Sequence, residues 1–152
     1  MHRYQATIRW QRDQQEFLDN RYSRAHEWLF DGGARVAASS SPLSVPLPMS
    51  VAANVDPEEA LVAATSSCHM LFFLWLAARA GRVVDSYVDQ AFGVMEKNDE
   101  GRMAITRIVL RPEIVFAGAA PSPDELARLH DDAHHQCYVA NSLKADVVVQ
   151  TA

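Results

Sequence analysis

Hydrophobic residues recur at every second position in several short stretches of the chain and at helical spacing in two longer ones. In the first third, Tyr4 to Trp10 alternates loosely, Tyr22 to Phe30 is rich in aromatic residues, and the turn at residues 31–33 leads into Ala34 to Ala38. These stretches predict three neighbouring strands. The serines and prolines of residues 39–48 can neither extend a helix nor lie in a central strand, so they predict an extended loop.

The end signals of a first helix are clear in the sequence. Asp56 can accept hydrogen bonds from the free amides of a first turn, Pro57 suits that turn, and Glu59 stands where a capping box needs a carboxylate. Gly81 suits the left-handed position that ends many helices. The sequence therefore predicts a helix over residues 57–80, about 36 Å long.

The middle of this helix is apolar enough to raise the question of a membrane span. Residues 60–78 contain no Asp, Glu, Lys or Arg. Residues 65–69, however, place five polar or polarisable groups near the centre, and no second apolar stretch accompanies this one. We therefore predict a buried helix of a soluble protein, with no membrane partner.

The second half of the chain predicts a hairpin, a second helix and a last strand. Val83 to Met95 and Met103 to Leu110 are interpreted as antiparallel strands joined by a turn at residues 97–101. Residues 122–141 begin with a second helix-start signal, and Ala145 to Gln150 form the last strand. The order β-β-β-α-β-β-α-β indicates an α+β fold. We expect one domain, divided into segments 1–55, 56–81, 82–121, 122–141 and 142–152.

Composition and charge exclude several classes of protein. The 152 residues are 49% hydrophobic, which is typical of a folded globular chain. The net charge of −5 disfavours binding to nucleic acid. The first ten residues lack the apolar run of a signal peptide, which favours a cytoplasmic protein.

Cys68 and Cys137 are the first candidates for chemistry. A lone cysteine in an apolar helix is most often a small, inert core residue. Cys137, however, follows Leu126, Leu129 and Ala133 on the inward face of the second helix, so the two thiols could meet where the helices pack and form a redox pair.

Glu58 adds a geometric condition. In a continuous helix its side chain lies roughly 15 Å along the axis from Cys68, too far for direct contact. A site that uses both residues requires a break in the helix or a second subunit. This favours a dimer.

Two sequence motifs carry a resemblance to a known family. The run VDPEEALVAATSSCHM places a glutamate ten residues before Cys68, and HHQCYVANSLKADVVV surrounds Cys137. Both resemble motifs of the osmotically inducible protein C (OsmC-like) family, which includes the organic hydroperoxide resistance proteins. The resemblance covers most of the chain.

The resemblance implies a fold, a mechanism and a set of partners. The fold would be an intertwined homodimer with antiparallel sheets around two long central helices. Cys68 would attack an organic hydroperoxide and become a sulfenic acid, and Cys137 would resolve it as a disulfide. Glu58 would orient a catalytic arginine. No cofactor would be bound, and an external dithiol such as a lipoyl group would reduce the disulfide.

The catalytic arginine is assigned by its position in the chain, without a matching motif. The family's Gly-Gly-Arg run is absent, and Arg24 lies at a similar distance from the Ser-Pro loop. Arg35 is the second choice. Tyr138 stands where the family usually has proline after the cysteine, which bears on the geometry of disulfide closure.

The remaining candidates are aromatic side chains and histidines. Phe72, Trp28 and His69 are predicted to contact an apolar substrate, although core packing explains most aromatic residues. On the helix, His69 is expected to point away from Cys68. His130 has the i, i+4 spacing of metal ligands with His134, but a surface pair is the simpler interpretation, and we expect no metal site.

Two hypotheses follow. The first is a dimeric thiol peroxidase that reduces organic hydroperoxides. The second keeps the fold and makes the protein a non-catalytic binder of small ligands or a thiol redox sensor.

Overall fold

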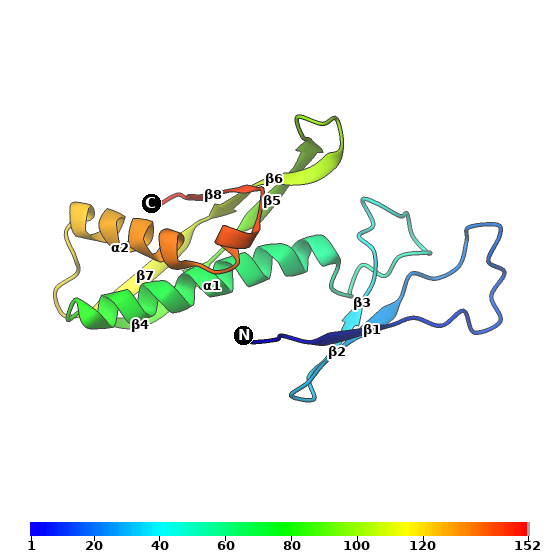
Figure 1. Cartoon of the computed structure of the whole chain (residues 1–152), viewed down its shortest axis with the longest axis horizontal. Helices are drawn as coiled ribbons and strands as arrows, with labels where there is room; N and C mark the ends of the chain where they lie inside the picture. The colour runs from blue at the N-terminus through cyan, green and yellow to red at the C-terminus, as the bar shows by residue number, and fades with distance from the viewer. Residues whose placement is uncertain (152) are drawn as a thin grey trace. The chain divides into compact units, whose positions relative to one another are not determined.

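The computed structural model describes residues 1–151, and the chain divides into two compact units. The N-terminal unit spans Met1–Ala60 and the C-terminal unit begins at Leu61. The helices and strands along the chain (Figure 1) are β1 Ala6–Arg9, β2 His26–Phe30, β3 Arg35–Ala38, α1 Pro57–Arg79, β4 Val83–Asp89, β5 Phe92–Lys97, β6 Met103–Leu110, β7 Pro112–Ala117, α2 Pro123–Gln136, a short 3-10 turn η1 Ala140–Ser142, and β8 Asp146–Val149. The predicted α+β class is confirmed.

The N-terminal unit is an antiparallel sheet in the order β1-β2-β3. The predicted strand over Tyr22 to Phe30 was too long, because β2 begins only at His26. Before it, the backbone N–H of Arg24 donates to the carbonyl of Met49 at 2.8 Å, which holds this stretch against the proline loop. A single bridge between Ala38 and Val55 then leads the chain to α1.

Helix α1 begins and ends as its sequence predicts. The N–H of Glu59 donates to Asp56 Oδ1 at 2.8 Å, and the N–H of Asp56 donates back to Glu59 Oε2 at 3.2 Å, which is a capping box. At the other end, Gly81 has φ of +73° and its N–H donates to the carbonyl of Ala78. The helix is unbroken over 23 residues.

The C-terminal unit contains a two-stranded sheet, β4-β7, and a three-stranded sheet in the order β5-β6-β8. The predicted hairpin of β5 and β6 is confirmed, while β8 pairs with β6 in parallel. The single strand predicted over Val83 to Met95 was wrong. It divides into β4 and β5, which meet at a corner at residues 89–92. Arg111 fixes this corner: its backbone N–H donates to Asp89 Oδ1 at 2.6 Å, and its guanidinium group donates to the carbonyl of Gln90.

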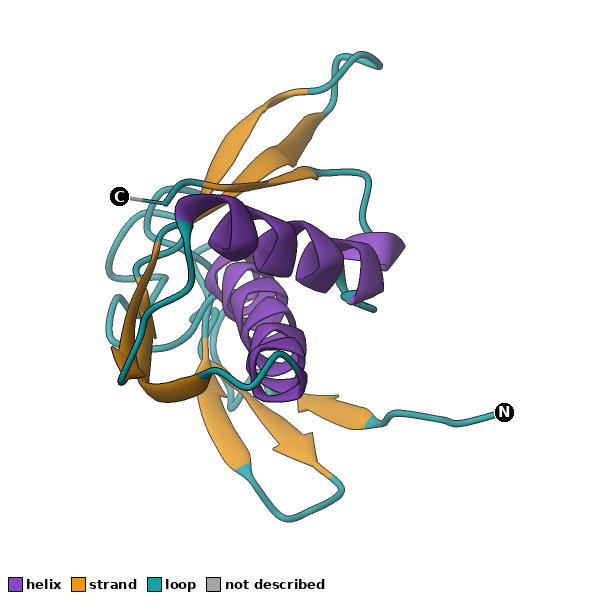
Figure 2. Ribbon diagram, turned by 90° about the vertical axis from the view of Figure 1, so that its left-hand side faces the viewer, coloured by secondary structure: helices purple, strands orange, loops and turns teal. Residues whose placement is uncertain are grey.

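The core of the C-terminal unit lies where the two helices meet the β4-β7 sheet. Phe73 and Ala77 of α1 pack against Leu129 and Ala133 of α2, and all four are buried. Side chains of β4 and β7 cover this cluster, and the two helices lie side by side (Figure 2). The packing therefore fixes α2 against the C-terminal half of α1.

Helix α2 is shorter than predicted. It ends at Gln136, and Cys137 is its C-cap residue rather than part of a helix over 122–141. The backbone turns there into an extended conformation, with φ −64° and ψ 110° at Cys137. The helix thus ends beside the thiol although Tyr138 replaces the proline of the family motif.

Candidate active site

Two free thiols lie next to each other at the junction of α1 and the end of α2. Cys68, in the middle of α1, is half-buried, and Cys137 is completely buried. Burial, with a smaller contribution from the neighbouring Cys68 thiol, raises the pKa of the Cys137 thiol to about 11, although the N–H of Ala140 donates to its sulfur at 3.3 Å. Cys137 is therefore protonated at neutral pH, and Cys68 is the thiol that a reagent from solution reaches first.

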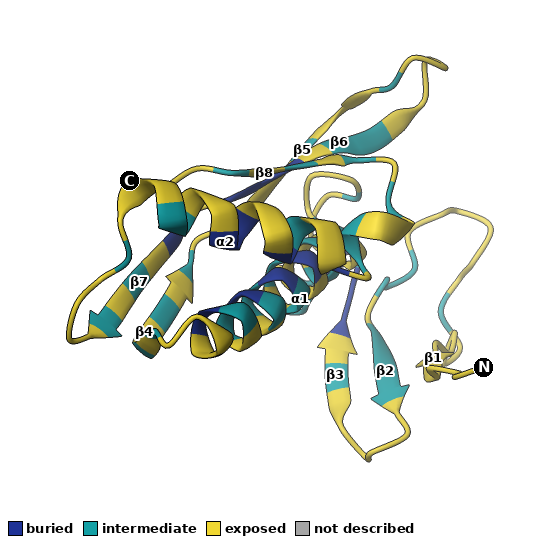
Figure 3. Ribbon diagram, turned by 60° about the vertical axis from the view of Figure 1, so that its left-hand side comes forward, coloured by how far each residue is buried: buried dark blue, intermediate teal, exposed yellow. Residues whose placement is uncertain are grey.

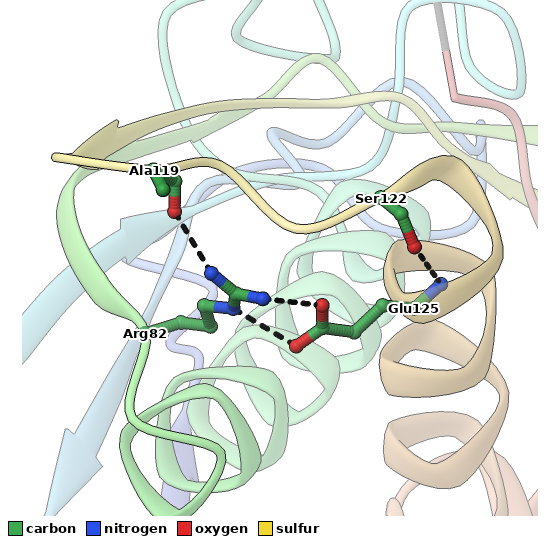
Figure 4. Close-up of polar contacts among 4 residues, drawn as sticks. All are labelled: Arg82, Ala119, Ser122 and Glu125. Carbon is green, nitrogen blue, oxygen red and sulfur yellow. Dashed lines mark hydrogen bonds and ion pairs between the residues drawn. The ribbon is translucent and has the colours of Figure 1, made fainter.

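An ion pair fixes the start of α2, at the opposite end of the helix from Cys137. Arg82 follows α1 and donates from Nε and from a terminal nitrogen to the two carboxylate oxygens of Glu125, at 2.9 and 2.6 Å (Figure 4). Arg82 also donates to the carbonyl of Ala119, and Ser122 caps the helix by accepting from the N–H of Glu125. The side-chain hydrogen bond that Glu125 accepts from Arg82 lowers the pKa of the Glu125 carboxyl group. The start of α2 is thus anchored to the end of α1.

His69 points away from solvent and toward α2. Its Nε2 lies 3.0 Å from Nδ1 of His130, and the two rings are nearly coplanar, with 10° between their planes. His69 is 1% exposed and His130 is 4% exposed. The interpretation of His130 as a surface residue was wrong, because it belongs to the face of α2 that packs on α1. His134 is half-buried on the same face.

No group of three or more metal-binding side chains lies together among residues 1–151. His130 uses Nδ1 in its contact with His69, and the Nδ1 atom of His134 is buried without a hydrogen-bond partner among these described residues.

The predicted carboxylate and arginines belong to the N-terminal unit. The Oε2 atom of Glu58 is buried and has no hydrogen-bond partner in the described chain. Arg24 donates to the carbonyls of Asn20 and Tyr22 and to Asn20 Oδ1, and its guanidinium lies 3.7 Å from the centre of the Tyr22 ring. Arg35 on β3 forms an exposed ion pair with Glu27 at 3.6 Å. Both arginines therefore have partners of their own.

The aromatic residues that were predicted to contact a substrate lie on different elements of the structure. Phe72 lies one turn after Cys68, and its ring meets that of Tyr138 edge-on with centroids 5.0 Å apart. This pair flanks both cysteines in the sequence. Trp28, on β2, donates its indole N–H to His26 Nε2 at 3.0 Å.

Sequence reasoning missed two features of this site. The His69–His130 pair joins the two cysteine-bearing helices, and its only signal was that His130 and Cys137 lie seven residues apart, which is two helical turns. The contact of Tyr138 with Phe72 had no signal in the sequence, because it depends on how the chain turns after Cys137.

The family model for OsmC-like proteins matches residues 51–152, which include α1, α2 and both cysteines. The chain belongs to the OsmC-like family. Among solved structures, an OsmC-like protein of unknown function from Vibrio cholerae is 49% identical, with full coverage of both chains and a TM-score of 0.97. A comparison with the curated proteins found no match.

Solved structures of much lower sequence identity share the fold. The organic hydroperoxide resistance protein OhrB of Bacillus subtilis is 15% identical over 99% of this chain and 98% of its own, with a TM-score of 0.71. An organic hydroperoxide resistance protein from Elizabethkingia anophelis is 14% identical over 99% and 94%, also with a TM-score of 0.71.

Proposed function

We propose that this OsmC-like protein is a thiol peroxidase that reduces organic hydroperoxides to alcohols. The observation that carries the proposal is the pair of adjacent free thiols, one accessible and one fully buried. An accessible thiol can meet a peroxide, and a buried neighbour can capture the product before further oxidation. The fold shared with two organic hydroperoxide resistance proteins supports the same chemistry.

The proposed reaction has three steps. The Cys68 thiolate attacks one peroxide oxygen, the O–O bond breaks, and the alkoxide takes a proton and departs as the alcohol, leaving a sulfenic acid. The Cys137 thiol then attacks the Cys68 sulfur, and the two sulfurs join as water leaves. An external dithiol reduces the disulfide and becomes oxidised itself.

Glu58 and an arginine complete the proposed site. The unpartnered buried Oε2 of Glu58 suits an ion pair with a guanidinium, since an unpaired buried carboxylate oxygen is unfavourable. Arg24 remains the first choice and must release its contacts with the carbonyls of Asn20 and Tyr22 to serve there. Arg35 needs only to leave its exposed pair with Glu27.

The preference for an organic substrate rests on Phe72 and Tyr138. Their edge-on pair puts apolar surface next to the positions of both cysteines, and Tyr138 is 72% exposed. An alkyl group can pack on these rings, whereas hydrogen peroxide gains nothing from them.

We further propose a homodimer as the working form. Among the described residues, α1 is the one helix long and apolar enough to cross a membrane, yet only 22% of that apolar window is buried within the chain. Figure 3 shows that buried and exposed positions both occur along α1. Leu71 and Trp75 are 60% and 47% exposed, and each follows a buried residue of α1 by two positions, which places it on the opposite side of the helix. A second copy packed on this face would bury them and supply a second Glu58.

The two free thiols suit a reducing compartment such as the cytoplasm.

The second candidate is a binder of small ligands or a redox sensor on the same fold. The observation in its favour is that Arg24 is held by carbonyls of its own loop, so no arginine is free at its predicted place. Such a protein would be oxidised once by peroxide and would not turn over.

Steady-state peroxide consumption separates the two candidates. The wild type, C68S and C137S would be given tert-butyl hydroperoxide or hydrogen peroxide, with dihydrolipoamide as the reductant. We expect turnover in the wild type, faster with the organic peroxide, and none in C68S. Full turnover in C68S would overturn the peroxidase, and a single oxidation without turnover in the wild type would favour the sensor.

A further inference from the structure

The buried histidine pair joins the two helices that carry the cysteines. His69 directly follows Cys68 on α1, and His130 lies two turns before Cys137 on α2. Their ring nitrogens are 3.0 Å apart, and the ring of His130 also stacks on Phe73 with centroids 4.5 Å apart. The pair therefore forms a polar contact inside an apolar helix interface.

This contact is costly in the form observed. One ring donates its N–H and the other accepts that hydrogen bond, so the second nitrogen of each ring still needs a hydrogen-bond partner. These atoms, His69 Nδ1 and His130 Nε2, are buried without a hydrogen-bond partner in the described chain. An unpaired buried donor costs about 1–3 kcal/mol, and an apolar pair of similar volume would avoid it.

Burial and neighbouring groups keep both rings neutral. Burial lowers the pKa of His130 to about 4, and burial together with the neighbouring His130 and His134 lowers that of His69 to about 4. Asp89, at the end of β4, acts on His69 in the opposite direction. Tyr87 of β4, whose ring contacts that of Phe73 at a tilt of 55°, has a raised pKa because it is buried, and so stays neutral as well.

We propose that His69 and His130 are positioning residues whose hydrogen bond holds α2 against α1 in the register that keeps the Cys137 sulfur next to the Cys68 sulfur. A directional hydrogen bond can fix register in an interface where apolar contacts alone allow sliding. Arg82 and Glu125 fix the start of α2, and the histidine pair fixes its middle, about two turns before Cys137.

The role rests on the proposed function, in which Cys137 captures the Cys68 sulfenic acid with loss of water. Capture competes with a second peroxide, which would add another oxygen to Cys68. Looser placement of Cys137 slows capture and leaves more sulfinic acid.

Equilibrium with a glutathione redox buffer tests the positioning without relying on peroxidase activity. It reports the effective concentration of one thiol toward the other. In H69L/H130L, which removes the hydrogen bond and keeps apolar packing, we expect that value to fall about fivefold. H69Q and H130N replace the bonding Nε2 and Nδ1 with amide groups at similar positions, so each should retain most of the wild-type value. H135Q, on the exposed side of α2, is the matched control.

Folding is checked by circular dichroism, so that variants are compared only under conditions where they are folded. If H69L/H130L is not folded, the comparison of H69Q and H130N with H69L and H130L singly takes its place. An effective concentration equal to that of the wild type in the leucine variants would overturn the positioning role. If the wild type does not reduce peroxides but the leucine variants still lower the effective concentration, the proposed function fails and the positioning role stands.

Discussion

Lowering the pH from 7 to 5 is expected to destabilise the folded chain by about 4 kcal/mol through His69 and His130 alone. The ordinary pKa of histidine is 6.5, and burial lowers it to about 4 in both rings. At pH 5 the unfolded chain therefore binds a proton at each ring and the folded chain does not. Each ring contributes about 2 kcal/mol to the difference.

The direction follows from where protons bind. Because the folded pKa lies below the unfolded one, the full stability is present above pH 6.5 and is lost as the pH falls toward 4. A domain of this size has a total stability of about 5–15 kcal/mol, so the loss is large enough to measure.

The assay is urea unfolding of the reduced protein at several pH values between 7 and 5, at one protein concentration. H69L/H130L should lose about 4 kcal/mol less than the wild type over this interval. H135Q should behave as the wild type, since His135 is exposed. Equal pH dependence in the wild type and in H69L/H130L would refute the reasoning, because it would mean that the two rings bind protons equally in both states.

Further predictions concern the thiols and the core. Iodoacetamide should modify Cys68 before Cys137 in the native protein, as followed by peptide mass spectrometry, because Cys137 is buried and its pKa is raised; equal rates would contradict this. Phe73→Ala should lower the free energy of unfolding by about 4 kcal/mol in urea titrations, since Phe73 is fully buried between the helices. Asp56→Ala should lower it by about 1 kcal/mol through loss of the cap on Glu59 N–H, and an unchanged value would show that the cap contributes nothing.

The parts of the fold that the sequence predicted depend on local signals. The capping box of Asp56 and Glu59 and the glycine at 81 set the bounds of α1 within one residue of the prediction. The β5-β6 hairpin was likewise predicted from its turn, where Asn98 Oδ1 accepts two backbone N–H groups. Such contacts join residues that are only a few positions apart, so the residue types that form them can be recognised in the sequence.

The parts that were missed depend on distant contacts. Strand β7 was not predicted; it begins at Pro112, a position where a strand tolerates proline, and it pairs with β4. The corner between β4 and β5 is held by Arg111, more than twenty residues away.

The site shows the same division. The burial of Cys137 followed from the helical spacing of its apolar neighbours and is confirmed. The two histidines at i and i+4 could lie on either face of α2, and only packing against α1 decides that His130 is inside. The contacts of Arg24 with the carbonyls of Asn20 and Tyr22 depend on the path of a loop, which no spacing reveals.

A single-turnover titration of the reduced protein with tert-butyl hydroperoxide tests the proposed peroxidase most directly. Each chain should consume one equivalent of peroxide, release one equivalent of alcohol and lose both thiols, with a mass decrease of two hydrogens and a Cys68–Cys137 disulfide in the peptide map. C68S should consume none. Oxidation of the wild type that leaves Cys137 reduced, or equal consumption by C68S, would contradict the role of these two thiols.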